Sequence, residues 1–421
     1  MRTLLLLTAL LVAAFSLSAQ TLDPQSVSRA GVHDLFDKSD ALNFNPAALG
    51  PDRGYAASWE LPSLGLGITN NSFGVGYWNQ HFGGDHNYSA SEIKDILDQI
   101  PSSGIRGDMQ MSVPVIGFGL HKFGARIAIQ SAGTVNLPKD LAVLALAGNE
   151  ANRMYNFSDL GGTGQVIADI GGGFSYRFDQ DKIPDLYFGA GFHYYQGLAL
   201  AMTKQVQGGF TANVSDSTAS LTGGGVFHTV TSTSGNGVGF DLGAMATLND
   251  KWEVGLSAQQ IGARISWDVK KNKFMSGYTD SLGIQANHMG DHAYFDSTFH
   301  KVDTTYDGGT VETTLPVILQ ANGRYKLSPR AYLLGDMAIR TTTTVQGRSG
   351  LELGAAGQYF PVRWWVLQGG VSVGGLWGAR FGAGTGFHFK HYILDIGGAW
   401  NGGAFNAARG VGFALSQRLL F

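Results

Sequence analysis

The chain lacks cysteine, contains few charged residues and has no long apolar run beyond its first twenty residues. Of its 421 residues none is cysteine, 11 are proline and 14% are Asp, Glu, Lys or Arg, against about 25% charged residues in ordinary soluble domains. Without cysteine the fold has no disulfide bonds. No later stretch reaches 18 consecutive apolar residues, which excludes a bundle of membrane-spanning helices.

The overall balance of residue types excludes three further classes. The net charge of -3 argues against a nucleic-acid binder. A hydrophobic share of 44% with 11% aromatics excludes intrinsic disorder. The 61 glycines, roughly twice the usual share, show no three-residue period and so do not form collagen. These exclusions leave a large β-rich protein with small residues in its strands.

Residues 1–19 have the three parts of a secretory signal peptide. Arg2 is followed by an apolar run from Leu4 to Phe15 and by small residues ending at Ala19. A transmembrane anchor is the alternative, but the run is short and no stop-transfer charges follow. No cysteine follows for lipid attachment. We expect an envelope protein that enters the membrane as a β-barrel, because only helices and closed barrels span bilayers.

Apolar and polar residues alternate with a period of two along many segments. In 238–248, Phe240 and Leu242 fall on one face, while Gly239, Asp241 and Gly243 fall on the other. One apolar face and one face of small and charged residues is typical of a transmembrane barrel. A soluble β-sandwich is the alternative, and the signal peptide, the few prolines and the final residue favour the barrel.

The fold class predicted is all-β, a transmembrane antiparallel barrel of about 14 strands, with 12 or 16 as alternatives. Short turns and long loops alternate between the strands, as they do in outer-membrane barrels, whose short turns are periplasmic. The predicted strands lie near 64–79, 110–119, 123–132, 165–178, 186–199, 236–248, 252–268, 314–327, 331–343, 350–359, 364–374, 380–389, 392–400 and 411–421.

Two further patterns concern the strand ends. The last strand ends in Phe421 and resembles the signal that outer-membrane barrels present to their assembly machinery. Aromatic residues at the strand ends predict two girdles at the membrane interfaces, with Trp267, Trp377 and Trp400 at the long-loop end.

Charged and polar side chains are predicted to face the barrel interior. Their signs are mixed, which is typical of structural pairs across a barrel, and a solute path is the alternative. By parity they are Asp169, Arg177, His193, Asp241, Glu253, Asn322, Arg324, Lys326, Asp336, Arg340, Glu352, Arg380, His388, Lys390, Asp395 and Arg418.

Residues 20–62 are predicted to form a hatch inside a barrel that spans 63–421. The segment contains Asp40, which is placed to cap a short helical turn, and then Asn45, Pro46 and Ala47. An acidic residue, a short apolar stretch and Asn-Pro-Ala near the mature N-terminus resemble the long-chain fatty-acid transporter superfamily (FadL/TodX-like). That resemblance implies a hatch folded within fourteen strands.

A second resemblance spans roughly the first half of the chain. Val135 to Asn149, Glu60 to Pro62, Asn70 to Tyr77 and Gly191 to Thr203 are similar to a family of uncharacterised Bacteroidetes outer-membrane barrels, a domain of unknown function. It implies architecture and location without an activity. Two loop stretches, 91–97 and 137–147, have the apolar spacing of short helices.

Signals for an enzyme, a cofactor or a metal are weak. The chain has no GxSxG, HExxH or Walker A motif in a fitting context. His288, Asp291, His292 and His300 cluster in the longest loop, where solvated histidines are the simpler interpretation. We therefore expect no enzymatic activity, no cofactor and no metal.

The function favoured is passive uptake of hydrophobic or amphipathic small molecules across the outer membrane of a Gram-negative bacterium. The expected partners are outer-membrane lipid, the barrel assembly machinery through the C-terminal strand, and a hydrophobic small molecule as ligand. The alternative is a non-transporting scaffold or a secretion or surface-interaction barrel. A carrier requires a gap beside the hatch, whereas the alternative predicts a sealed interior.

The signal peptide gives a direct prediction. Protein purified from outer membranes should begin at Gln20, because the small residues ending at Ala19 form the cleavage site. Intact mass and N-terminal sequencing measure this. An N-terminus that retains Leu4 to Phe15 would contradict the prediction and indicate an anchor.

Overall fold

A computed structural model gives the three-dimensional structure of the chain. It describes residues 22–35, 38–84, 87–179, 185–214, 219–269, 271–278, 300–306, 308–344 and 348–421. The predicted signal peptide, residues 1–19, lies outside this range.

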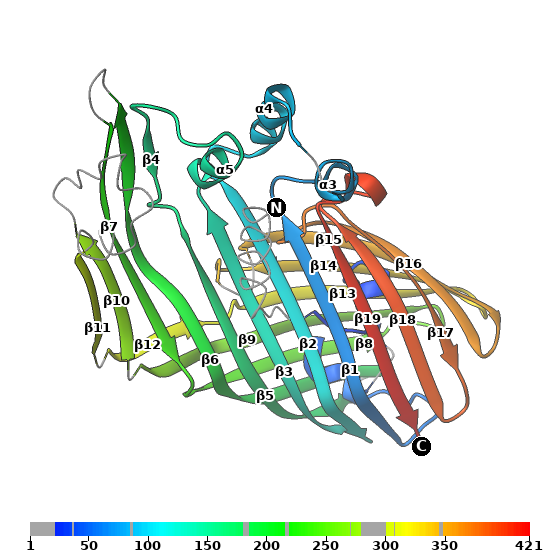
Figure 1. Ribbon diagram of the computed structural model, residues 1–421. Coiled ribbons are helices and arrows are strands. Elements are labelled where there is room, and N and C mark those ends of the chain that lie inside the picture. Colours follow the sequence, from blue (N-terminus) through cyan, green and yellow to red (C-terminus); the bar gives the residue numbers. More distant parts are fainter. Residues whose placement is uncertain are drawn as a thin grey trace.

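The predicted fourteen-stranded antiparallel barrel is confirmed (Figure 1). Each wall strand pairs with the next along the chain, and pairing of the last with the first closes the barrel. The wall strands are β1 (Ala57–Asn70), β2 (Ile105–Leu120), β3 (Phe123–Leu137), β5 (Gly161–Phe178), β6 (Asp185–Val214), β8 (Gly235–Thr247), β9 (Trp252–Val269), β13 (Ile318–Ser328), β14 (Ala331–Arg340), β15 (Gly350–Val362), β16 (Trp365–Gly374), β17 (Arg380–His388), β18 (Tyr392–Asn401) and β19 (Gly410–Leu420).

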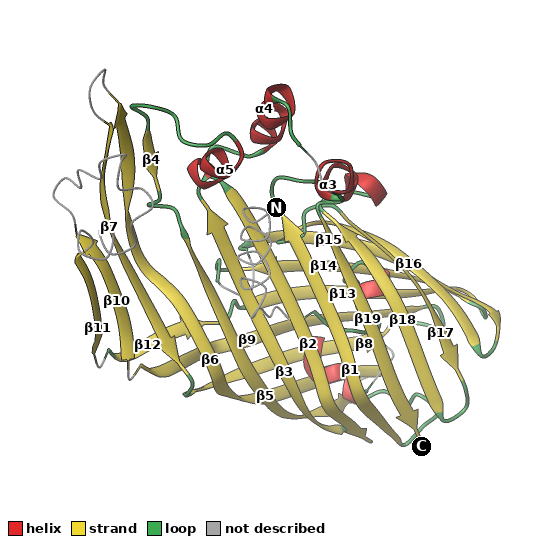
Figure 2. Ribbon diagram, in the orientation of Figure 1, coloured by secondary structure: helices red, strands yellow, loops and turns green. Residues whose placement is uncertain are grey.

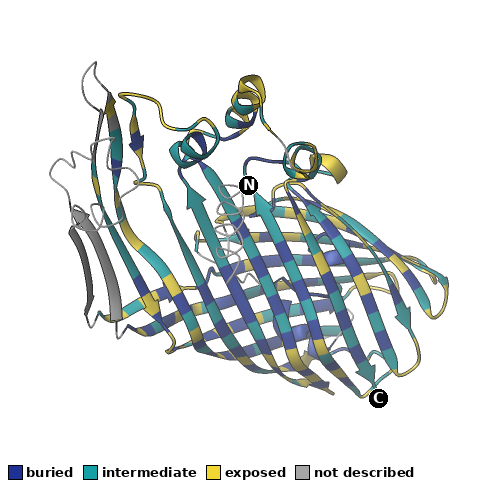
Figure 3. Cartoon of the chain, viewed as in Figure 1, coloured by how far each residue is buried: buried dark blue, intermediate teal, exposed yellow. Residues whose placement is uncertain are grey.

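Side chains alternate between the two faces of the wall, so buried and more exposed residues alternate along its strands (Figure 3). In β8, Phe240 and Leu242 are 51% and 56% exposed, whereas Asp241 between them is 4% exposed. The apolar outer face and the polar inner face therefore follow from the two-residue period of the sequence.

The two ends of the barrel differ (Figures 1 and 2). The C-terminus and the short turns, such as 121–122 and 329–330, lie at one end. Helices α3 (Val75–Phe82), α4 (Ala90–Gln99) and α5 (Lys139–Leu146) lie at the other. The predicted helices at 91–97 and 137–147 correspond to α4 and α5. A capping box between Ser89 and Glu92 starts α4.

Two predicted long loops contain strands. Within 200–235, β6 continues to Val214 and β7 (Ala219–Ser232) pairs with it. Within 269–313, β10 (Lys271–Tyr278) pairs with β7 and with β11 (His300–Tyr306), and β12 (Gly309–Thr314) pairs with β9. A short strand β4 (Met154–Asn156) also joins β6. The sheet thus extends beyond the barrel on one side (Figure 1).

The predicted strand at 64–79 and the boundary at 63 are wrong in position. Strand β1 begins at Ala57 and ends at Asn70, and helix α3 follows from Val75. The Asn70 Oδ1 accepts hydrogen bonds from the backbone N–H groups of Ser72 and Phe73, 2.8 and 2.6 Å away. This side-chain turn competes with the β-ladder and ends the strand.

Two of the tryptophans predicted for the girdle at the long-loop end lie in the interior instead. Trp267 is fully buried, because it lies on the same side of β9 as the inward-facing Glu253. Its indole N–H donates a hydrogen bond to Thr313 Oγ1. Trp377 lies in the β16–β17 turn and packs over Gly67, where an added Cβ would be 2.8 Å from its ring. Trp400 is partly exposed.

No helix in the described part of the chain has the length and apolarity needed to cross a membrane.

The outer apolar face gives a depth-dependent prediction. Leu242→Arg, near the middle of β8, should lower the free energy of unfolding by about 2–4 kcal/mol, because a lipid-facing arginine is costly at that depth. Leu248→Arg, at the short-turn end, should cost about 0–1 kcal/mol. Urea titration in phospholipid vesicles, followed by tryptophan fluorescence, measures both. Equal costs would contradict a membrane-spanning wall.

Candidate functional site inside the barrel

The N-terminal segment, residues 22–50, lies within the barrel and is almost entirely buried in its described parts (Figure 1). It contains three short helices, η1 (Val27–Arg29), α2 (Ala41–Phe44) and η2 (Pro46–Leu49). Its apolar side chains form a small core with wall residues Tyr187 and Met245. The segment therefore fills the interior with a folded unit.

The Asn45-Pro46-Ala47 motif holds this segment against β8 and β9. The fully buried Asn45 accepts a hydrogen bond from the Ala47 N–H at 3.0 Å and so caps η2. Its Nδ2 donates to the carbonyl oxygens of Ala244 and Leu256, at 3.2 and 3.3 Å. One side chain therefore fixes both the local turn and its position on the wall.

Glycines on the wall make room for the motif. A Cβ at Gly243 would collide with the Asn45 side chain, and a Cβ at Gly189 would collide with the backbone of Ala47. Any larger residue at either position would displace the segment.

Asp40 does not cap α2 as predicted. It occupies the position before the helix with helical backbone angles, and its side chain makes no capping hydrogen bond. The side chain of an N-cap residue accepts from the helix when its own backbone is extended, and Asp40 lacks that conformation.

The predicted interior charges form separate groups, of which the most buried is centred on His193. Its Nδ1 lies 2.7 Å from Asp169 Oδ1 and its Nε2 lies 3.1 Å from Asp241 Oδ2. The three side chains come from β5, β6 and β8. They tie three neighbouring strands together.

A second group binds the N-terminal segment to the wall. Arg324 Nε lies 3.2 Å from Asp34, and its Nη1 lies 3.3 Å from Glu253. Glu253 also pairs with Arg53, which donates a hydrogen bond to the Leu35 carbonyl oxygen at 2.8 Å. The neighbouring strands β9 and β13 therefore hold the segment at Asp34 and Leu35.

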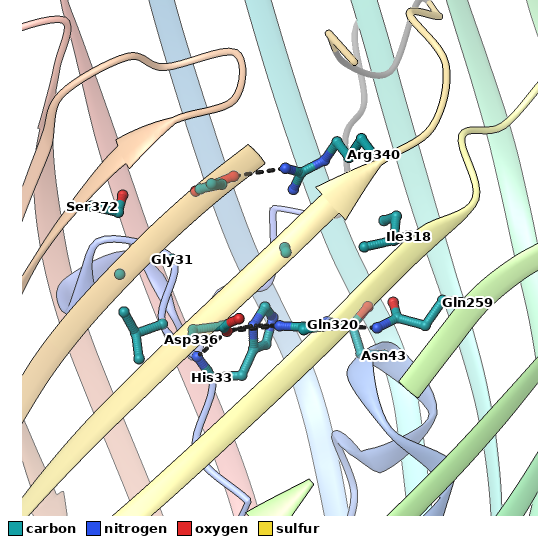
Figure 4. Close-up of a pocket in the computed structure, with 13 residues that line it drawn as sticks. Gly31, His33, Asn43, Gln259, Ile318, Gln320, Asp336, Arg340 and Ser372 are labelled. Atoms are coloured by element: carbon teal, nitrogen blue, oxygen red, sulfur yellow. Dashed lines mark hydrogen bonds and ion pairs between the residues drawn. The ribbon is translucent and has the colours of Figure 1, made fainter. Parts of the chain in front are cut away.

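The third group surrounds a small cavity between the segment and the wall (Figure 4). His33 Nδ1 lies 3.1 Å from Asp336 Oδ2 and 3.0 Å from Gln320 Nε2. Arg340 pairs with Glu352 at 2.7 Å on the same cavity. The cavity has a volume of about 40 Å³, which is room for a few water molecules. It is too small for a hydrophobic ligand.

The fourth group lies around Asp395. Arg418 pairs with it, and His388 Nε2 lies 2.9 Å from its Oδ1. Arg418 also donates to Gln25 of the segment at 2.8 Å, and Arg29 donates to Gln368 of the wall at 2.9 Å. This group seats η1 on the C-terminal strands.

The predicted Asn322 belongs to the third group, because its Nδ2 donates to Asp336 Oδ2 at 3.1 Å. Four other predicted residues are not in these groups. Arg177 is exposed at the short-turn end and pairs with Asp185 at 3.0 Å, and Lys326 and Lys390 are exposed there too. Arg380 is buried with its guanidinium 5.7 Å from the Trp377 ring, and its Nε and Nη2 find no hydrogen-bond partner among the described residues.

Sequence reasoning missed the charged residues of the segment itself and Arg53, which follows it. Arg29, His33, Asp34 and Arg53 each meet a wall residue of complementary chemistry. Charged residues within a stretch predicted to lie inside the barrel were the available signal. Among the described residues, no group of three or more His, Asp or Glu side chains has the arrangement of a metal site. His288, Asp291, His292 and the side chain of His300 lie outside the described part.

Comparison with known families identifies the chain. Residues 46–394 match the model of a family described as a family of unknown function, DUF5723. The chain belongs to the DUF5723 family. No curated protein matches it.

This DUF5723 protein also resembles solved outer-membrane barrels in fold. The toluene transporter TbuX of Ralstonia pickettii is 14% identical, with 97% of this chain and 100% of that chain covered and a TM-score of 0.55. The toluene transporter TodX of P. putida is 11% identical, with 96% and 99% covered and a TM-score of 0.55. The predicted FadL/TodX-like resemblance is thus confirmed at the level of the fold.

The Asn45 contacts give a prediction. Asn45→Ala should loosen the segment, because it leaves the Ala47 N–H and two wall contacts unpaired at a buried site, at a cost of about 2 kcal/mol or more. Hydrogen exchange of residues 38–50 should rise while that of β15 stays unchanged. Asn79→Ala on the exposed side of α3 is the control. Unchanged exchange in Asn45→Ala would show that the motif does not hold the segment.

Proposed function

We propose that this protein is a passive carrier of hydrophobic or amphipathic small molecules in the outer membrane of a Gram-negative bacterium. Residues 22–50 act as its hatch. The observation that carries the proposal is the seating of this segment inside the barrel by Asn45, in a fold like that of proteins described as toluene transporters. No catalytic step is part of the proposal.

The contacts of the segment support a hatch that can move. Much of its attachment consists of polar contacts, such as Arg324 with Asp34, Arg29 with Gln368 and His33 with Asp336. Water can replace each of these partners when it enters, whereas a fully apolar interface would lose its hydrophobic contacts on opening. The cavity beside His33 is too small for a solute, so passage on that side requires the segment to shift.

The C-terminal strand supports outer-membrane assembly as part of the proposal. The Phe421 N–H donates to the Ala57 carbonyl oxygen at 2.9 Å, and its own carbonyl oxygen accepts from the N–H groups of Ala56 and Ala57. Its ring is 58% exposed. The final residue thus completes the seam while its ring is accessible to assembly machinery.

The alternative is a scaffold or secretion-related barrel without transport. The cavity of about 40 Å³ beside His33 favours it, because a scaffold requires a blocked interior. A larger space of about 320 Å³ lies between the segment and the wall at the short-turn end, where Gln25, Asp34 and Pro329 contribute to its lining. The two functions differ in whether displacement of the segment opens a path.

A disulfide that locks the segment to the wall distinguishes a carrier from a scaffold. It can be introduced without competing thiols, because the chain contains no cysteine of its own. An added Cβ at Gly124 of β3 would lie 2.7 and 3.2 Å from the two terminal carbons of Leu49 in η2. This contact makes Gly124→Cys with Leu49→Cys the pair to test, and the mass of the oxidised protein shows whether the disulfide has formed. Uptake of labelled fatty acid and of labelled toluene into proteoliposomes is then measured in oxidised and reduced protein.

For a carrier, the oxidised double variant should show at least tenfold lower flux than the wild type, and a thiol reductant should restore it. Each single cysteine variant is the control and should be insensitive to reductant. Wild-type flux equal to that of empty liposomes for both solutes would reject transport and leave the scaffold.

A further inference from the structure

An apolar groove lies on the outer surface of the barrel beneath α3, outside the interior described above. Its volume is about 290 Å³, and its lining includes Ile68, Phe73, Trp78, Met109, Val135 and Val411. This is close to the lower end of ligand-binding pockets, which begin at roughly 300 Å³. The groove can take an apolar chain and is too small for a large ligand.

Strand register places the groove on the lipid-facing side. Ile68 of β1 lies beside Met109 of β2 and beside Val411 of β19, which is 42% exposed. Gly67, the next residue along β1, faces the interior and packs against Trp377. The floor of the groove is therefore the outer face of three neighbouring strands.

Helix α3 forms the overhang, and its position is fixed by hydrogen bonds. The Asn70 Nδ2 donates to the carbonyl oxygens of Phe73 and Arg409, at 2.9 and 2.6 Å. The Val75 N–H donates to the Ala408 carbonyl oxygen at 2.7 Å. α3 lies near the upper ends of β1 and β19 (Figure 1). The space between helix and wall is thus a built feature.

Aromatic residues place the groove at the membrane interface. Val411 is in register with Trp400 of β18, whose ring lies 5.0 Å from that of the 69% exposed Phe405 in η4 (Phe405–Ala407). Trp78 of α3 is 40% exposed. Tryptophans gather at the boundary between acyl chains and headgroups, so the groove lies at that level.

The lining of the groove includes two charged residues. Arg409 is exposed, whereas Asp108 is buried and pairs with Arg106 at 2.8 Å. No ion pair joins the Arg409 side chain to a carboxylate in the described ranges of the chain. An arginine at this depth suits a phosphate, which it binds through directed hydrogen bonds.

We propose that the groove binds one anionic lipid of the surrounding leaflet. An acyl chain lies between α3 and the wall, and the lipid phosphate contacts Arg409. The lipid would brace α3, and with it the loop that follows β1, against the barrel. This site is separate from the proposed transport path, because its lining faces the bilayer.

Native mass spectrometry of the mature protein tests the proposal, with dioleoyl phosphatidylglycerol and the matched phosphatidylcholine as probes. The wild type should retain one phosphatidylglycerol at least tenfold more tightly than phosphatidylcholine. Arg409→Gln should remove most of this preference, since it keeps the size of the side chain but removes its charge.

A second variant fills the groove. Gly107 lies in the lining, and a Cβ there meets no atom within 4 Å, so Gly107→Trp should fold and weaken retention of both lipids at least tenfold. Gly357→Trp is the matched control, an outward-facing glycine of β15 whose added Cβ would meet nothing closer than 3.9 Å. Heat-dependent gel migration confirms folding of both variants.

Two results would overturn the assignment. Retention in folded Gly107→Trp equal to that in Gly357→Trp would show that the lipid binds elsewhere. Equal retention of the two lipids, unchanged in Arg409→Gln, would show a groove that takes apolar chains without regard to charge.

Discussion

Hydrocarbon offers no hydrogen-bond partner to a peptide group, and every other feature of this protein depends on that constraint. The wall satisfies it by closing β1 on β19, from Ser58 beside Leu420 to Thr69 beside Gly410. Once the sheet is closed, its inner face surrounds a space between the two ends of the barrel. Something must then fill that enclosed space or leave it to water.

The N-terminal segment fills it, and its chemistry follows from that of the inner face. The wall presents carboxylates, arginines and amides, so the segment supplies partners such as Arg29, His33 and Asp34. Its apolar residues pack on one another and on Tyr187 and Met245. The result is an interior held together largely by polar contacts, which can exchange with water more easily than a hydrophobic core.

Much of the wall was predictable because a strand encodes its two faces with a period of two. Most strands from 165–178 to 411–421 lie close to their predicted positions, and parity located most of their inward charges. Arg177, Lys326 and Lys390 are exceptions, since they are exposed at the short-turn end. The prediction failed where a side chain redirects the backbone, as Asn70 does at the end of β1. It also failed in 200–235 and 269–313, where added strands pair only with one another or with the ends of wall strands.

The sequence by itself determined that the chain is a closed barrel with an apolar outer face, because alternation, low charge and the absence of long apolar runs leave no other membrane-spanning form. It also singled out Asn45, Pro46 and Ala47 as a candidate hatch motif. Only the tertiary structure decided which charges meet, such as His193 with Asp169 and Asp241, since these pairs join strands separated in sequence. The groove beneath α3 is likewise tertiary, because β1, β2 and β19 meet there only after the barrel closes.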